Sequence, residues 1–492
     1  MMKFPRSKSS YYPSVRQDKF VAKKTLNLFH QAAKEIPAYK DFLQKENVQP
    51  GKIKTLEDFQ KYVPITDKDN YITQYPLHML SWGGDLFSNQ IIASSSGTTG
   101  QPFFWPRGIL QDNEGIESHE VIYRDIFKAD HLKTLVVVCF SMGEWVAGFF
   151  TATSTLGVAS RGYKLNVVTP GLERASAVRS IKTLGHYYDQ VIIAGYPPFL
   201  KDILDEGRQS GINWSKLNVK LLMAGEGFSE EWRDYIIKEV GATNPYTDAI
   251  NIYGCADATM LGHETPASIL IRRIYNRSPR LRQEIFKTSN LSSLVQYYPM
   301  QRYFEAVDSS LIVTAQTGIP LIRYNTQDKG GIYTFEELVR PVQERFINRS
   351  QFLEPSLDRW KKLPFIYLHG RTGSVATIYS VNIYTENIKA VLVDKRVRQW
   401  VTGRFTMATK YLPNMDQSFV VNVELAKGVT RGQVDRKLLL EVMVKKICRL
   451  NAEYSYLYKS IRERAEPKIE LIDWGDADYF SRDGKHKWVT KA

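Results

Sequence analysis

Residues 93–102 read Ala-Ser-Ser-Ser-Gly-Thr-Thr-Gly-Gln-Pro, a stretch dense in hydroxyl groups and glycines. Such a loop can donate hydroxyl and backbone N–H groups to an anion, above all a phosphate. It is not a Walker A loop, because no lysine follows the glycines. A flexible linker has a similar composition. The apolar flanks, Ile91-Ile92 and Phe103-Phe104-Trp105, instead favour a loop between two buried strands.

The composition is that of a globular chain with ample core, since 43% of its 492 residues are hydrophobic. No window approaches the ~18 consecutive apolar residues that a membrane span requires. Three cysteines exclude a disulfide scaffold and a cysteine-rich zinc module. Basic residues near the start are not followed by an apolar segment, so no secretory signal is predicted and we expect a cytoplasmic protein.

The net charge of +14 leaves several partners open. A nucleic-acid surface, an anionic membrane surface and a site for phosphate-bearing small molecules would all suit it. Basic clusters lie mainly in the last quarter, at 395–398, 436–437, 445–446 and 485–487. Solvated helix faces are the ordinary explanation for such clusters. We therefore expect no nucleic-acid partner, although charge alone does not decide function.

Short runs of β-branched and apolar residues predict an α/β fold with strands buried on both faces of a parallel sheet. The runs are 135–140, 165–168, 191–193 and 219–223. Ligands bind beyond the carboxyl ends of such strands. The loops that follow are therefore candidate walls of a site, at Gly143, Pro170, Gly195, Gly225 and Gly254.

Other patterns divide the chain into segments. Residues 20–36 predict an amphipathic helix stopped by Pro37, and 265–307 predict a mostly helical excursion that returns to the sheet at 311–313. After Gly370 a compact α+β unit is expected. Its expected strands are 404–409, 418–424 and 468–472, its helix is 438–450, and a polar, exposed tail runs from 473 to 492.

The serine-rich loop resembles the phosphate-binding motif [ST]SGTTGxP of the adenylate-forming enzymes. Four later stretches resemble the family's other motifs, in the family's order: Asn251-Ile252-Tyr253-Gly254-Cys255-Ala256-Asp257, Pro320–Asp328, Gly370-Arg371 with Val381-Asn382-Ile383-Tyr384, and Asp483-Gly484-Lys485. The segments 36–39 and 56–68 are similar to the phenylacetate–CoA ligase-like branch, which includes capsular polysaccharide (CapK-like) proteins. The resemblance covers nearly the whole chain.

This resemblance implies a large N-terminal domain of mixed β-sheets and helices, 1–369, and a small mobile α+β C-terminal domain, 370–492. It implies an AMP-forming acid–thiol ligase that uses ATP, Mg²⁺ and coenzyme A. The acid would become an acyl-adenylate and then a thioester. A small-molecule acid would be the substrate, and a homodimer is one option for the assembly.

The resemblance also assigns residues. Nucleotide binding falls to Ser94, Ser95, Ser96, Gly97, Thr98, Thr99, Gly100, Gly225, Glu226, Tyr253, Gly254, Asp328 and Arg371. Tyr253 would lie along the adenine, and Asp328 would accept the ribose hydroxyls. Asp257 would hold Mg²⁺, and Lys485 would neutralise charge between the acid and the α-phosphate.

Some positions depart from the family pattern. Ala256 lacks the expected hydroxyl, Asp257 is shorter than the usual glutamate, Gln327 replaces a glycine, and Gly373-Ser374 replace paired aspartates. Cys255 and His263 suggest a metal only weakly, because no third ligand stands at a suitable spacing.

An aromatic or apolar acid is expected. Its candidate pocket residues are Phe140, Trp145, Phe149, Tyr196, Pro197 and Gly225-Glu226-Gly227. The alternatives are adenylation with transfer to an amine or a protein, a non-catalytic nucleotide- or acyl-binding protein, and a nucleic-acid-binding protein.

Overall fold

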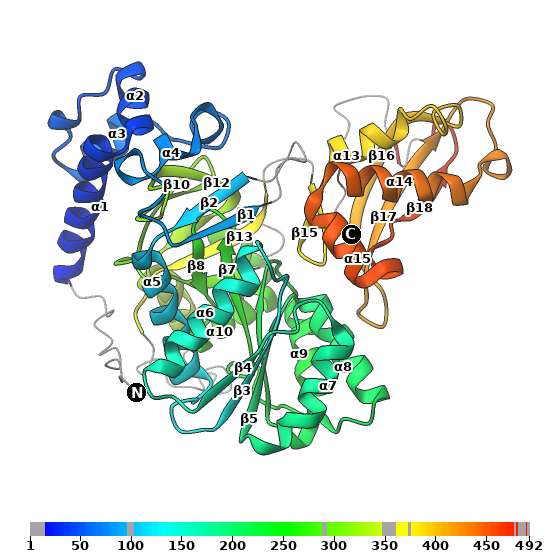
Figure 1. Ribbon diagram of the computed structural model, residues 1–492, viewed down its shortest axis with the longest axis horizontal. Helices are drawn as coiled ribbons and strands as arrows, with labels where there is room; N and C mark the ends of the chain where they lie inside the picture. Colours follow the sequence, from blue (N-terminus) through cyan, green and yellow to red (C-terminus); the bar gives the residue numbers. More distant parts are fainter. Residues whose placement is uncertain are drawn as a thin grey trace.

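The computed structural model describes residues 15–95, 103–287, 293–346, 361–371, 375–476, 479, 480 and 489. Two named parts are used below: the main unit, residues 15–371, and the C-terminal unit, residues 375–476. The two lie side by side (Figure 1). Residues 96–100 of the serine-rich loop and Lys485 fall outside the described ranges.

Within the described residues, an 11-stranded sheet runs through the main unit in the order β10-β11-β12-β13-β9-β8-β7-β6-β5-β3-β4. Its parallel half consists of β3 (Thr134–Cys139), β4 (Leu165–Val168), β5 (Gln190–Gly195), β6 (Val219–Ala224) and β7 (Ala249–Cys255). Every residue of β3 and β5 is buried. The expected α/β fold and the parallel strands are confirmed.

Helices cover both faces of this half, which explains why every residue of its strands β3 and β5 is buried. They are α6 (Val146–Ser160), α7 (Arg174–Leu184), α8 (Pro197–Gln209) and α9 (Glu230–Glu239). Figure 1 shows α7, α8 and α9 on one face and α6 on the other. The carboxyl ends of β5 and β6 lead into α8 and into the loop that holds Gly225 and Glu226.

The other half of the sheet is antiparallel. Its strands are β8 (Thr259–His263), β9 (Ser293–Gln296), β10 (Arg302–Val307), β11 (Ser310–Ala315), β12 (Leu321–Tyr333) and β13 (Phe365–Arg371). Helices α10 (Pro266–Arg277), α11 (Pro279–Phe286) and α12 (Phe335–Phe346) pack against it. The return at 311–313 is confirmed as β11. The mostly helical excursion is wrong in part, because 265–307 also contributes β9 and β10.

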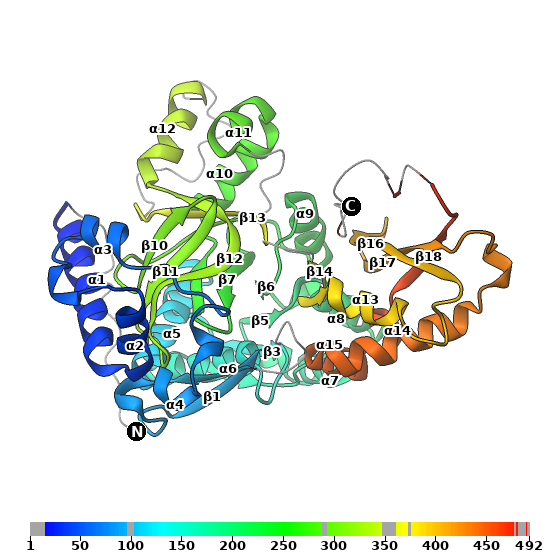
Figure 2. The ribbon, with the colours of Figure 1, turned by 90° about the horizontal axis from the view of Figure 1, so that it is seen from above.

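The N-terminal helices pack on the β10–β12 side of the sheet (Figure 2). They are α1 (Val15–Glu35), α2 (Pro37–Lys45), α3 (Leu56–Tyr62) and α4 (Leu77–Leu80). The first helix ends before Pro37, as predicted, and the proline begins the next helix because its missing N–H is harmless there. Thr66 forms a β-bridge with Tyr324 and donates its hydroxyl to Ile322 O over 2.9 Å.

A hairpin of β1 (Ile91–Ser95) and β2 (Phe103–Arg107) flanks the serine-rich loop, and α5 (Ile109–Val121) follows it. Two buried strands were expected from the apolar flanks of the loop. The strands are confirmed, but their burial is only partial, because Ile92 and Phe104 are exposed. Ala93 and Trp105 face each other across the hairpin and are both buried.

The C-terminal unit contains a sheet of β16 (Val401–Tyr411), β17 (Gln417–Leu425) and β18 (Lys468–Ile472) and a hairpin of β14 (Val375–Ile378) and β15 (Val381–Tyr384). Its helices are α13 (Thr385–Leu392), α14 (Arg436–Leu450) and α15 (Ala452–Ile461). The predicted strands and helix are confirmed, while α15 was not predicted. The predicted exposed tail is wrong at Phe480, which is fully buried and lies under the Arg404 guanidinium.

No helix in the described ranges combines the length and hydropathy needed to cross a bilayer.

Candidate functional site

Tyr253 and Asp328 meet although they belong to separate motifs. Tyr253, near the end of β7, donates its hydroxyl to Asp328 Oδ2 on β12 over 2.8 Å. Asp328 is also the direct cross-strand partner of Arg371 on β13. Burial raises the pKa of Tyr253 well above its ordinary value, and the Asp328 carboxylate adds to the rise. The phenol therefore stays protonated and donates to the carboxylate.

Asp257, just after β7, is a second carboxylate of the site besides Asp328. It accepts a 2.6 Å hydrogen bond from the Tyr324 hydroxyl on β12. Lys68 lies 3.7 Å from Asp257 Oδ1 and also stands over the Trp105 ring, 5.7 Å from its centroid. The backbone pairing of Thr66 with Tyr324 brings Lys68 to this place, so the N-terminal segment contributes to the site.

Ser94 and Ser95 end β1 at the edge of the same region. Ser95 Oγ accepts a 3.0 Å hydrogen bond from Trp105 Nε1, and the Ser94 backbone N–H donates to Glu144 O over 2.8 Å. The Ser94 hydroxyl is buried and has no partner among the described residues. A buried hydroxyl without a partner is suited to donate a hydrogen bond to an acceptor atom of a bound ligand.

These site residues are connected through one cluster of buried side chains. Trp105, Tyr253 and Tyr324 belong to the same group of buried apolar residues. The structure thus brings together Ser94, Ser95, Tyr253, Asp257, Asp328 and the backbone of Arg371, while 96–100 and Lys485 lie outside the described ranges. Sequence reasoning missed Lys68 and Tyr324; their proximity to Asp257 depends on a strand pairing that no local pattern reveals.

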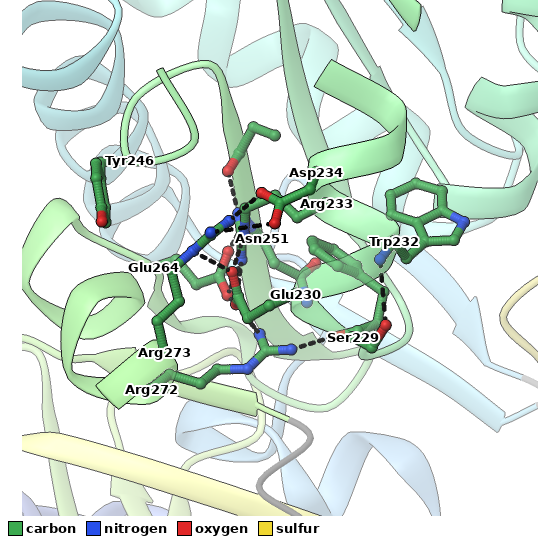
Figure 3. A network of polar contacts seen from close by, with 12 residues as sticks. Ser229, Glu230, Trp232, Arg233, Asp234, Tyr246, Asn251, Glu264, Arg272 and Arg273 are labelled. Carbon is green, nitrogen blue, oxygen red and sulfur yellow. Dashed lines mark hydrogen bonds and ion pairs between the residues drawn. The ribbon is translucent and has the colours of Figure 1, made fainter. Parts of the chain in front are cut away.

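A buried ion-pair network fixes the strand that carries Tyr253 (Figure 3). Glu264, fully buried, accepts hydrogen bonds from Arg233 Nη2 over 2.7 Å and from Arg272 Nη1 over 3.0 Å. Its other oxygen accepts the Asn251 backbone N–H on β7 over 2.8 Å. The network therefore ties α9 and α10 to β7.

Glu230 is the second acid of this network. It pairs with Arg233 at 2.9 Å and with Arg273 at 2.8 Å. Burial would raise the pKa of Glu230, but the neighbouring arginines outweigh it and hold the pKa below its ordinary value. Arg272 also donates to Phe228 O, so the network anchors the loop after β6. Sequence reasoning noted the arginine-rich segment and missed this role.

The loop after β6 contacts the C-terminal unit. The Glu226 carboxylate accepts hydrogen bonds from Gln417 Nε2 at 3.1 and 3.2 Å and from the Ser380 backbone N–H at 3.3 Å. Its backbone carbonyl accepts Asn251 Nδ2 over 3.1 Å. Desolvation raises the pKa of the Glu226 carboxyl to about 7, against the lowering effect of these hydrogen bonds.

The aromatic candidates for an acid pocket gather only in part. Phe140 and Tyr196, at the ends of β3 and β5, lie edge to face with ring centroids 5.1 Å apart. Trp145 instead packs against Tyr456 of the C-terminal unit, 6.3 Å between centroids. Phe149 is 37% exposed. Phe140 and Tyr196 are therefore the pair that the structure brings together.

Metal-ligand chemistry is limited. In the part of the chain that the structure describes, no three His, Cys, Asp or Glu side chains group to hold a metal ion. His263 is occupied by Glu264 O and the Tyr298 hydroxyl, and burial lowers its pKa to about 4. A lone carboxylate such as Asp257 does fit Mg²⁺, which commonly takes one or two carboxylates and completes its shell with phosphates and water.

No family model matches the sequence, and none of the curated proteins matches it either. Solved structures do match. A crystal structure of 2-hydroxyisobutyryl-CoA ligase with 2-HIB-AMP and CoA in the thioesterification state is similar over 99% of this chain and 94% of that one, with 16% identity and a TM-score of 0.68. The same ligase gives 0.56 in a postadenylation state with 2-HIB-AMP, and 0.57 in an open conformation. The chain thus has the fold of adenylate-forming CoA ligases. This fold combines a large mixed sheet covered by helices with a small C-terminal sheet.

Proposed function

We propose that this protein activates a carboxylic acid with ATP and transfers the acyl group to coenzyme A. The observation that carries the proposal is the meeting of Tyr253, Asp257 and Asp328, from two separate motifs, in a chain with the fold of CoA ligases. In the first step an acid oxygen attacks the α-phosphorus and pyrophosphate leaves. In the second the thiol sulfur attacks the acyl carbon, AMP leaves with the bonding electrons, and the thiol proton passes to solvent.

Each residue takes a part in this proposal. Asp328 accepts the ribose hydroxyls, because a carboxylate can accept from two neighbouring hydroxyls at once. Tyr253 holds Asp328 in place and lies beside the adenine. The hydroxyls of the 94–99 segment receive the phosphates, and the buried, unpartnered Ser94 hydroxyl supports this assignment.

Charge at the reacting phosphate is balanced by cations from three places. Asp257 would hold Mg²⁺, and the bound ion would supply a positive charge on the phosphate oxygens. Lys68 lies next to Asp257 and orients its carboxylate. Lys485 is proposed to approach the acid and the α-phosphate in the first step. Gly225, Gly254 and Arg371 would line the nucleotide.

The acid is proposed to be aromatic or apolar. Phe140 and Tyr196 support this class, because both are nearly fully buried at the carboxyl ends of parallel strands, where ligands of such sheets bind. A phenylacetate–CoA ligase-like branch, a domain boundary near 369, a cytoplasmic location and a homodimer belong to the same proposal.

The arrangement of the two units is proposed to be that of the acyl-transfer step. The chain is more similar to the reference ligase in its thioesterification state, with a TM-score of 0.68, than in its postadenylation state, with 0.56. Coverage and identity are the same in both comparisons.

A panel of carboxylic acids tests the function. Purified protein, ATP and Mg²⁺ are incubated with each acid, and pyrophosphate release is measured. Acid-dependent release from at least one aromatic or apolar acid is expected, followed by thioester formation when coenzyme A is added. Release without any thioester would favour an amine or protein acceptor, and no release across a broad panel would favour a non-catalytic binding protein.

A further inference from the structure

The main unit forms one contact surface for the C-terminal unit. It consists of α8 and the loop at Gly225-Glu226, and it receives the β14–β15 turn and the start of β17. At its centre Gln417 connects both sides: its Nε2 donates to Glu226, and its Oε1 accepts the Tyr379 backbone N–H over 2.6 Å. One amide thus holds both the main unit and the turn.

The β14–β15 turn packs closely against the main unit. Tyr379 and Ser380 have φ of 47° and 65°, so both stand in the left-handed region that side chains adopt rarely. A Cβ added to Gly225 would lie 2.5 Å from Ser380 Oγ and 2.6 Å from its Cβ. The absence of a side chain at Gly225 lets the turn approach this closely.

Charged groups on α8 add a second row of contacts. Lys201, 3% exposed, donates to Asp416 at 2.7 Å and to Asp205 at 2.6 Å. Asp202, 2% exposed, accepts the Tyr379 hydroxyl over 3.1 Å and pairs with Arg464. Buried charges that lose their partners are costly. The interface therefore favours this arrangement through matched charges on both sides.

We propose that Glu226 and Gln417 are a positioning pair for acyl transfer: by joining the loop after β6 to the Tyr379–Ser380 turn, they hold the C-terminal unit where the second step takes place. The inference rests on the proposed function and adds to it which residues select the arrangement. Neither side chain needs to touch the reacting atoms. Lys201 and Asp202 support the pair from α8.

An exchange of the two side chains provides the test. In Gln417→Glu a second carboxylate faces Glu226. At pH 8 the docked pair must either hold two negative charges together or take up a proton from solution, and both weaken docking. In the double variant Glu226→Gln with Gln417→Glu, the amide and the carboxylate change places. The carboxylate introduced at position 417 can then accept from the amide introduced at position 226 and from the Tyr379 N–H. The oxygen of that amide can accept the Ser380 N–H, so the hydrogen bonds between the pair and to the Tyr379 and Ser380 N–H groups have counterparts.

Two readouts separate positioning from general damage. Transfer is measured at pH 8 by adding coenzyme A to pre-made acyl-adenylate, and adenylation is measured as acid-dependent pyrophosphate release without coenzyme A. For Gln417→Glu we expect transfer to fall about tenfold or more and adenylation to stay within about twofold. The exchanged double variant should transfer at least about threefold faster than Gln417→Glu. Glu441→Gln, on an exposed helix face of the same unit, is the matched control.

Small-angle X-ray scattering of the whole chain reads the arrangement without any catalysis. Gln417→Glu should change the scattering profile from that of the parent protein, and the double variant should restore the parent's profile. Unchanged transfer and scattering in Gln417→Glu, failure of the exchange to restore them, or equal loss of both steps would overturn the proposal. If the parent protein releases no pyrophosphate with any acid, the proposed function fails, while scattering still decides whether the pair sets the arrangement.

Discussion

Tyr253 donates a hydrogen bond to Asp328 Oδ2 over 2.8 Å, which links the end of the parallel half of the sheet to β12 of the antiparallel half. Asp328 is only 6% exposed, and its cross-strand partner is Arg371. Two stretches that the sequence could only place in order are thus joined at one carboxylate. The proposed ribose contact depends on this carboxylate.

Replacing Asp328 should weaken nucleotide binding. Asp328→Ala removes the acceptor for a diol, and we expect ATP affinity to fall by about tenfold or more, measured by isothermal titration calorimetry. Tyr253→Phe, which keeps the ring and removes only the hydroxyl, should cost about threefold or less. Unchanged affinity in Asp328→Ala would contradict the ribose role.

Lys485 should matter for one step only. Lys485→Ala should abolish acid-dependent pyrophosphate release, because the charge that develops at the α-phosphate loses its counterion. Thioester formation from pre-made acyl-adenylate should remain nearly intact, as measured by chromatography of the product. Equal loss of both steps would indicate a structural tail.

Gly225 should be intolerant of a side chain because of what lies opposite. Gly225 has φ of +95°, and Gly225→Ala also places a methyl group within 2.6 Å of Ser380. Gly211 is a matched control, since it has φ of +84° and nothing within 4 Å of an added Cβ. Both alanine variants should lose about 1 kcal/mol of stability in urea unfolding. Only Gly225→Ala should also slow acyl transfer, and equal transfer rates would contradict the close packing.

The docking of the C-terminal unit should depend on pH. The pKa of Glu226 is about 7 in the docked arrangement against an ordinary 4.5. Docking therefore favours the protonated form, is strongest at acidic pH and weakens as the pH rises through about 7. If the pKa returns to its ordinary value on separation, the docking equilibrium should fall about tenfold between pH 6 and pH 8.

The two tyrosines at this interface should not titrate in that range. Tyr379 and Tyr411 face Glu226, and burial raises the pKa of both well above the ordinary tyrosine value of 10.0. On α8, Lys201 is paired with Asp416 and Asp205, and Asp202 is paired with Arg464. Scattering profiles at pH 6 and 8 measure the effect. Glu226→Gln should remove the dependence and stay docked at both values, so a dependence that persists in this variant points elsewhere.

The buried network around Glu264 should govern stability. Glu264→Gln leaves Arg233 and Arg272 without their full counter-charge, and breaking a buried pair costs about 3–5 kcal/mol. Chemical denaturation of the whole chain measures it. Glu344→Gln removes an exposed pair with Arg340 and should change stability by less than about 1 kcal/mol. Similar losses in both variants would show that the network contributes little.

Strong local patterns were predictable from the sequence, and contacts made by folding were not. The continuous β-branched runs marked β3 and β5 correctly because both are buried on both faces. The apolar flanks of the serine-rich loop also marked β1 and β2, although Ile92 and Phe104 of this hairpin are exposed. By contrast, β9 and β10 lie in an arginine-rich segment. Arg302 and Glu305 of β10 are buried in ion pairs with Glu114 and Arg323, so the charges of β10 concealed that strand.

The site divides in the same way. Tyr253, Asp257 and Asp328 were predictable because each belongs to a stretch that resembles a motif. Lys68 and Tyr324 also lie in stretches that resemble the family, but their contacts with Asp257 were not predictable, because folding brings together segments that are distant in the sequence. Gln417 has no distinctive neighbourhood in the sequence, and only the packing of the two units reveals its contact with Glu226.

The β-bridge between Thr66 and Tyr324 has a practical consequence for anyone shortening this chain. A fragment that begins at the β1–β2 hairpin would contain the serine-rich loop and the stretches 251–257 and 320–328, yet it would lack Lys68, the cation beside Asp257, and the Thr66 backbone that pairs with β12. The segment from Thr66 to Lys68 is thus part of the surroundings of Asp257, and a shortened chain would lose both of its contacts there.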